Sequence, residues 1–116
     1  MPRKFIHSLK YARAGAEHAL RTQRNIWIHS FVGLLVIGVA FGLRIGGVEL
    51  ALLILTIILV LTTEMLNTAI EEVVNLAQPE QHPLAALAKN VAAGAVLVAA
   101  IGSVIIGLII FLPKLM

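Results

Sequence analysis

Three long apolar segments, residues 26–43, 48–63 and 91–112, dominate this chain of 116 residues. A membrane-spanning helix needs roughly 17–25 mostly apolar residues, so the first and third segments are long enough as they stand. The second segment is shorter, but its helical pattern continues past Glu64 to about Leu76. A helix over 48–76 would be about 43 Å long, which exceeds a hydrocarbon core of about 30 Å. We therefore expect its last turns to project out of the membrane.

The composition fits the same interpretation, because hydrophobic residues make up 59% of the chain. A soluble domain of this size cannot bury so much apolar surface. We predict an all-α integral membrane protein whose single domain covers residues 1–116. The sequence contains no cysteine, which excludes disulfides and thiolate chemistry. Residues 1–25 lack the pattern of a signal peptide, and we expect none to be removed.

Basic residues predict the orientation. Lys89 lies before the third span, and Arg44 and Lys114 mark the other side of the membrane. The remaining basic residues all precede the first span: Arg3, Lys4, Lys10, Arg13, Arg21 and Arg24. The positive-inside rule then places the N-terminus and the 77–90 loop in the cytoplasm and the C-terminus outside.

Residues 1–25 read as an amphipathic helix that lies on the membrane surface. One face carries Lys10, Arg13, Glu17, Arg21 and Arg24, and a neighbouring apolar face carries Phe5, Leu9, Ala12, Ala16 and Leu20. The simplest role is an anchor to anionic headgroups, with Trp27 as an interfacial aromatic residue.

A polar stripe follows the second apolar run. All six acidic residues are glutamates, and four of them fall between residues 64 and 80. At 100° per residue, Glu64, Asn67, Glu71 and Asn75 share one helical face. Glu64 and Glu71 are about 10.5 Å apart along the axis, too far to chelate one ion together. This separation suits a base at one end of a substrate and a metal-bound phosphate at the other.

Each of these side chains also has a simpler interpretation. Glu71, Glu72 and Asn75 could be solvated residues on an emerging helix end, and for Glu72 this is the favoured reading. Glu64 lies about 24 Å of helical rise after Val48, near the inner edge of the hydrocarbon. A charge at that depth costs a few kcal/mol and usually serves a function. We predict that Glu64 is a general base.

Other polar residues carry weaker signals. His7, His18 and His29 are spaced by eleven residues, or about 16 Å per gap on a helix, which excludes a shared metal site. Lys89 could bind a phosphate or could be an ordinary interfacial lysine. The only glycine-rich turn, residues 42–47, lies on the outer side, so a Walker or Rossmann phosphate loop is excluded.

Four short sequences occur along the chain in a recognisable order. The chain reads EMLNTAIEEVVNL from Glu64, then PEQHPLAALAKNVAAGAVL from Pro79, with RTQRN before the first span and GLIIFLPKL near the end. This order resembles the small bacterial membrane kinases of the diacylglycerol kinase/undecaprenol kinase family over nearly the whole chain. The resemblance implies a homotrimer in the bacterial inner membrane that transfers the γ-phosphate of MgATP to a lipid hydroxyl. Its active sites would lie between subunits near the cytoplasmic interface.

The resemblance also implies roles for single residues. Glu64 is similar to the catalytic base, Asn67 to its positioning neighbour and Glu71 to a magnesium ligand. Gln23 stands where some members carry a metal-binding Glu, so the implied metal ligands are Glu71 and Gln23. The other nucleotide-binding positions are Lys4 and Tyr11, which would close over ATP, and Glu80, Gln81, His82, Lys89 and Asn90.

Three amides depart from the family pattern: Gln23, Asn75 and Asn90 stand where Glu or Asp is common. An amide oxygen can still bind Mg²⁺, but it brings no charge. We therefore expect an active enzyme with a raised Mg²⁺ requirement.

The resemblance predicts ATP-dependent phosphorylation of undecaprenol or diacylglycerol, giving undecaprenyl phosphate or phosphatidic acid, and no nucleic-acid partner. The TQRN and HPLA sequences favour undecaprenol. One alternative is a small proton-coupled carrier that uses Glu64. Another is a non-catalytic assembly subunit, because small residues that allow close helix packing line the third span: Ala92, Ala93, Ala95, Ala99, Ala100, Gly102, Ser103 and Gly107. We interpret these small residues as the packing surface of the oligomer.

Overall fold

The computed structural model describes the backbone of residues 2–116 and the side chains from Arg3 onward. It contains four helices: α1 (Pro2–Thr22), α2 (Arg24–Gly42), α3 (Gly47–Ala77) and α4 (Pro83–Leu115). The predictions of an all-α fold and of three long apolar helices after an N-terminal helix are confirmed.

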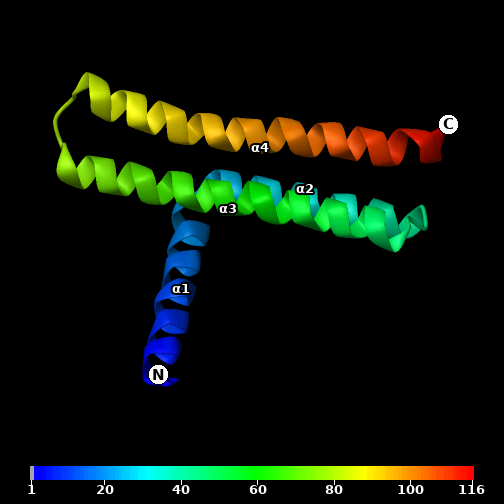
Figure 1. Ribbon diagram of the computed structural model, residues 1–116, viewed down its shortest axis with the longest axis horizontal. Helices are drawn as coiled ribbons and strands as arrows, with labels where there is room; N and C mark the ends of the chain where they lie inside the picture. The colour runs from blue at the N-terminus through cyan, green and yellow to red at the C-terminus, as the bar shows by residue number, and fades with distance from the viewer. Residues whose placement is uncertain (1) are drawn as a thin grey trace.

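The three long helices run side by side, and α1 leaves them at a steep angle (Figure 1). Helix α3 contacts each of the other three helices. Within residues 2–116, the backbones of α2 and α4 do not approach each other closely. Helix α3 is therefore the central element, with α2 and α4 packed on different parts of its surface.

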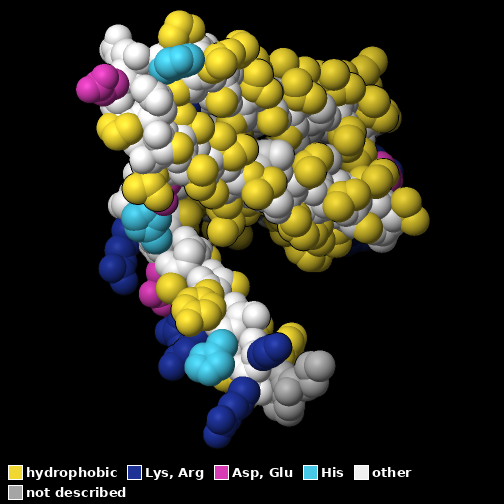
Figure 2. Space-filling model, turned by 60° about the vertical axis from the view of Figure 1, so that its left-hand side comes forward, with side chains coloured by type: hydrophobic (Ala, Val, Ile, Leu, Met, Phe, Trp, Pro, Cys, Tyr) yellow, Lys and Arg dark blue, Asp and Glu magenta, His cyan; other side chains and the backbone are white. Residues whose placement is uncertain are grey.

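The molecule does not have the shape of a soluble globule. Its radius of gyration is 17.3 Å, whereas a compact soluble chain of this length has about 13 Å. Large apolar side chains cover the surface of the long helices, and basic side chains gather along the protruding α1 (Figure 2). Helices α2, α3 and α4 are each long and apolar enough to cross a membrane. The chain is therefore a multi-pass membrane protein with three candidate spans.

The long helices differ in length. Helix α2 has 19 residues, which give about 28 Å and just match a hydrocarbon core of about 30 Å. Helix α3 has 31 residues and α4 has 33, which give about 46 and 50 Å. Both α3 and α4 therefore extend beyond the core, as expected for the end of α3.

Two helix boundaries differ from the expected ones. The N-terminal helix ends at Thr22, because Gln23 has an extended backbone (φ −109°, ψ 108°), and Arg24 already belongs to α2. Helix α4 begins at Pro83, so the expected 77–90 loop shrinks to residues 78–82. Proline is favourable in the first turn of a helix, and His82 Nδ1 accepts a hydrogen bond from the Leu84 amide at 3.1 Å.

Small residues set the spacing between helices. A Cβ atom on Gly33 would lie 3.1 Å from Ile57 Cγ2, so α2 and α3 approach closely there. Ala92 and Ala99 of α4 are buried within the chain. These two residues of the expected oligomer surface therefore pack inside one chain, whereas Ala93 and Ala95 stay exposed. At the other end of the bundle, Ala40, Leu53 and Ile110 form a small apolar core.

Candidate functional site

The buried side of α3 changes from apolar to polar along the helix. Leu53, Thr56, Val60, Glu64 and Thr68 are its buried residues, at spacings of three or four. Spacings of three and four keep residues on one face, so this face packs against the neighbouring helices. The carboxylate of Glu64 therefore lies in a helix–helix contact whose earlier part is mostly apolar.

Glu64 is 3% exposed, and its carboxylate contacts a histidine. The distance from His29 Nε2 on α2 to Glu64 Oε1 is 3.3 Å. The Thr68 hydroxyl does not serve the carboxylate, because it donates to the Glu64 backbone carbonyl at 3.0 Å. The sequence singled out Glu64 but missed the contact with His29. Both residues lie near the same edge of the membrane spans, and that shared depth is the signal that could have found the pair.

Asn67 and Glu71 lie further along the same stripe. Asn67 Nδ2 donates to Glu71 Oε1 at 3.4 Å, and both residues are partly buried. Asn67 Oδ1 is buried and, among the described residues, has no hydrogen-bond partner. A buried acceptor without a partner costs about 1–3 kcal/mol unless something pairs with it. The stripe therefore presents an unpaired amide oxygen beside a carboxylate.

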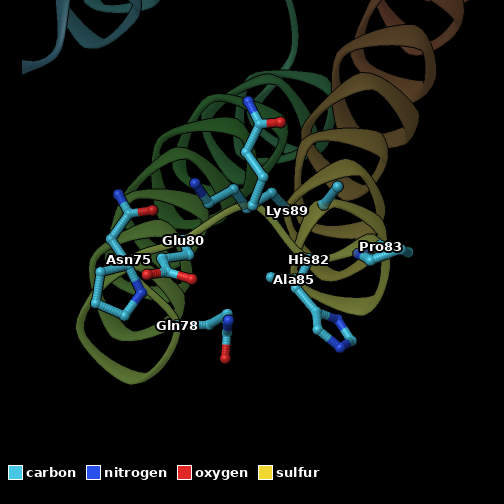
Figure 3. A pocket seen from close by; sticks show the side chains of 10 residues that line it. Asn75, Gln78, Glu80, His82, Pro83, Ala85 and Lys89 are labelled. Carbon is cyan, nitrogen blue, oxygen red and sulfur yellow. The ribbon is translucent and has the colours of Figure 1, made fainter.

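A pocket of about 630 Å³ lies at the loop between α3 and α4. Asn75 and Glu80 lie on its α3 side, and His82, Pro83 and Ala85 lie on its α4 side (Figure 3). Its lining includes five residues that the sequence singled out: Asn75, Glu80, Gln81, His82 and Lys89. Asn90 follows Lys89 on α4 but does not line the pocket. The fold thus gathers residues from about one helical turn before the loop to about two turns after it.

Other predicted residues are not brought to this pocket. Lys4 and Tyr11 are exposed on α1, which runs away from the bundle (Figure 1). Gln23 is partly buried at the break between α1 and α2, and no described hydrogen bond links it to Glu71. Residues 2–116 contain no group of three or more His, Asp or Glu side chains that could hold a metal ion. One chain therefore does not assemble a complete protein-only metal site.

The oxygens of the stripe nevertheless suit Mg²⁺ bound together with phosphates. Mg²⁺ is usually held by one or two carboxylates and by substrate phosphate oxygens. Glu71 supplies a carboxylate, and the unpaired Oδ1 of Asn67 supplies a neutral oxygen on the same face. Lys89, in the adjacent pocket, provides a positive charge for a phosphate.

A second histidine–glutamate pair ties α1 to α3. His18 Nε2 lies 2.7 Å from Glu72 Oε1, and both side chains are more than half exposed. Glu72 was expected to be only solvated, and this expectation was incomplete, because the residue is exposed but has a partner. Trp27 also connects the helices, since its indole N–H donates to the Leu20 carbonyl. These contacts fix the base of α1 against the bundle.

The family model for prokaryotic diacylglycerol kinase matches residues 10–111. The chain belongs to this family of lipid kinases. The match spans the whole polar stripe, the pocket and the three candidate membrane spans except for the last four residues of α4.

Individual members of the family are also similar. A diacylglycerol kinase of Synechocystis is 48% identical over 110 residues, which are 94% of this chain and 63% of that protein. An undecaprenol kinase of Bacillus subtilis is 42% identical over 112 residues, which are 97% of this chain and 91% of that protein. A diacylglycerol kinase of Haemophilus influenzae is 31% identical over 81% of this chain and 80% of that protein. The chain thus spans just under two thirds of the Synechocystis relative and nearly all of the Bacillus relative.

Proposed function

We propose that this chain transfers the γ-phosphate of ATP to the hydroxyl of a membrane lipid alcohol at the cytoplasmic face of the bacterial inner membrane. The carrying observation is that one face of α3 joins the buried Glu64 to a polar pocket at the helix end. Membership of the lipid kinase family supports the same reaction. The product would be undecaprenyl phosphate or phosphatidic acid.

Glu64 is the proposed general base. It takes the proton of the lipid hydroxyl while the hydroxyl oxygen forms a bond to the γ-phosphorus. The bond from that phosphorus to the β–γ bridging oxygen breaks, and ADP leaves with the bonding electrons. Because this transfer needs little covalent help from a protein, the residues act mainly through position and charge. Asn67 positions Glu71, to which it donates a hydrogen bond, relative to Glu64.

The nucleotide end of the site uses the other predicted residues. Glu71 and Asn67 would hold Mg²⁺, which neutralises charge on the phosphate oxygens when it is bound. Lys89 contributes a fixed positive charge, and the loop residues Glu80, Gln81 and His82 contact the nucleotide. Along α3, Glu64 and Glu71 are separated by about 10.5 Å of rise. That spacing lets one helix serve a hydroxyl at the membrane edge and a triphosphate in water.

The proposed orientation follows from the charges. Five basic residues precede α2, Arg24 is its first residue, and Lys89 lies near the start of α4. The positive-inside rule therefore places the N-terminus, the α3–α4 loop and its pocket in the cytoplasm. ATP is available on that side.

We further propose that the working unit is a homo-oligomer, a trimer by resemblance to the family. In one chain, Lys4, Tyr11 and Gln23 are not in contact with the pocket, and the pocket is open on the surface. A neighbouring copy could bring its own α1 over the nucleotide. The exposed small residues Ala93 and Ala95 of α4 suit close helix contact between copies.

Of the two lipid classes, undecaprenol is the proposed physiological acceptor. The TQRN and HPLA sequences favour it, and the Bacillus relative that aligns over 91% of its length is an undecaprenol kinase. The diacylglycerol kinases among the relatives make diacylglycerol the competing acceptor.

The test is lipid phosphorylation in reconstituted vesicles. The purified chain is supplied with Mg²⁺, ATP labelled at the γ-position, and either undecaprenol or diacylglycerol. We expect label in the lipid fraction, with the higher kcat/KM for undecaprenol. A higher value for diacylglycerol would reverse the lipid assignment alone. No label with either lipid, combined with proton-coupled solute flux through the same vesicles, would overturn the kinase proposal in favour of a carrier.

A further inference from the structure

We propose that His29 is a positioning residue for the general base: its Nε2 holds Glu64 Oε1 and leaves Oε2 to accept the proton of the lipid hydroxyl. This inference rests on the proposed kinase function and assigns a part to a residue of α2, a helix that supplies no other member of the polar stripe.

The contact is specific to one side chain. The His29 Nε2 to Glu64 Oε1 distance is 3.3 Å, and the glutamate side chain is 4% exposed. Two nearby polar groups are already committed: the Thr68 hydroxyl to the Glu64 carbonyl, and the Asn67 amide to Glu71. Among the described residues, His29 is the only side chain in polar contact with the Glu64 carboxylate.

A general base needs this kind of support because its reach is short. The carboxylate oxygen must lie within about 3.2 Å of the oxygen whose proton it takes. A displacement of about 1 Å can cost roughly 100-fold in rate. A glutamate side chain with no partner can rotate away from the productive direction. A side chain on a second helix that contacts one oxygen restricts the direction in which the other oxygen points.

The packing around His29 makes the support rigid. Gly33 lies one helical turn beyond His29 on the same face of α2, and a Cβ there would lie only 3.1 Å from Ile57 Cγ2 of α3. Gly33 and Ile26, one turn on either side of His29, are both buried. The imidazole is thus held at a set distance from α3 by contacts before and after it.

Two substitutions separate positioning from packing. His29→Gln keeps an N–H donor at about the reach of Nε2, whereas His29→Leu removes the donor and keeps the bulk. We expect His29→Leu to lower kcat roughly 30- to 100-fold, with KM for lipid and for ATP within about twofold of native. We expect His29→Gln to retain at least about ten times the kcat of His29→Leu. The measurement is steady-state phosphorylation of lipid in vesicles, with each lipid at saturation.

A third variant keeps the test decisive if His29→Leu does not fold. His29→Asn carries the same amide as His29→Gln on a side chain one carbon shorter, so its donor falls short of Oε1. We expect its kcat to be about tenfold below that of His29→Gln, with the two melting temperatures equal. Melting temperature and oligomer size are recorded for every variant.

The outcomes that would overturn the inference are distinct from failure of the proposed function. If the native chain phosphorylates lipid and His29→Leu keeps native kcat, His29 does not position the base. If the glutamine and asparagine variants lose activity equally, or if KM rises while kcat stays, the role is packing or substrate binding. If the native chain phosphorylates no lipid, the kinase proposal itself fails.

Discussion

Two glutamates of α3, eight residues apart, each contact a histidine from another helix, and the two pairs differ in burial far more than in chemistry. In the His29–Glu64 pair the side chains are 30% and 4% exposed, and in the His18–Glu72 pair they are 53% and 58% exposed. The exposed pair has the shorter contact, 2.7 Å against 3.3 Å. Contact distance therefore does not separate them. Water does, because an exposed ion pair contributes about 0–1 kcal/mol, whereas a charged side chain inside a span is costly and is usually kept for a function.

The strongest test of this comparison is the same substitution at both glutamates. Glu64→Gln removes the proposed base with almost no change in volume, and we expect kcat to fall by about 100- to 10,000-fold. Glu72→Gln is the matched control, and its kcat should stay within about twofold of native. Both are measured as lipid phosphorylation at saturating substrates. Equal losses at the two positions would show that burial does not distinguish the pairs.

The neighbouring carboxylates Glu71 and Glu72 sharpen the comparison further. They are adjacent in sequence but face directions about 100° apart. Glu71→Gln should raise the Mg²⁺ concentration for half-maximal activity by about tenfold or more, because the stripe loses its proposed charged metal ligand. Glu72→Gln should leave that concentration unchanged. The measurement is a Mg²⁺ titration at fixed ATP, and an equal shift in both variants would contradict the assignment of Glu71.

The spacing of α2 and α3 offers a test through packing alone. In Gly33→Ala the new Cβ would lie 3.1 Å from Ile57 Cγ2, so either the Ile57 side chain or α2 must shift by a few tenths of an ångström. We expect a loss of about 1–3 kcal/mol in the free energy of unfolding and a fall in kcat as His29 leaves Glu64. Gly38→Ala is the control, because a Cβ there meets nothing within 4 Å. Thermal unfolding in detergent and lipid phosphorylation are the two measurements. If both variants behave alike, the close approach at Gly33 does not determine the contact between His29 and Glu64.

The smallest effect is expected at the exposed pair. His18→Gln should reduce the stability of α1 against α3 by less than about 1 kcal/mol. Hydrogen exchange of the α1 amides measures this directly, and it should quicken slightly while exchange in α3 stays the same. Arg13→Gln is a control on the same helix, because its contact with Glu17 lies within α1. A large loss of kcat in His18→Gln would place this pair in the reaction and remove the contrast.

Much of the fold could be predicted from the sequence because its signals are local. Long apolar runs indicate the spans, and the spacing of Glu64, Asn67 and Glu71 places them on one face without knowledge of any other helix. The start of α4 was missed because Pro83 was taken as a break, although proline is also a good first residue of a helix. His29 was missed because its partner is 35 positions away and depends on how two helices are set against each other.

The site followed a different route. The residues of the pocket were identified by resemblance rather than by their chemistry, since Glu80, Gln81 and His82 carry no distinctive spacing of their own. The structure gathers them, but it leaves Lys4, Tyr11 and Gln23 away from the pocket. If these three residues act across a subunit boundary, as we propose, the packing of one chain cannot place them at the pocket.

The two ends of the site receive side chains from different helices, and this has a consequence for how the site can be altered. The side chain that touches the proposed base, His29, comes from α2. The lysine of the pocket, Lys89, comes from α4, and neither His29 nor Glu64 lines that pocket. Substitutions at separate sites that share no partner usually combine additively in free energy. A change at His29 and a change at Lys89 should therefore multiply in their effects on rate. The preference for the lipid that accepts the phosphate and the preference for the nucleotide that donates it can then change independently.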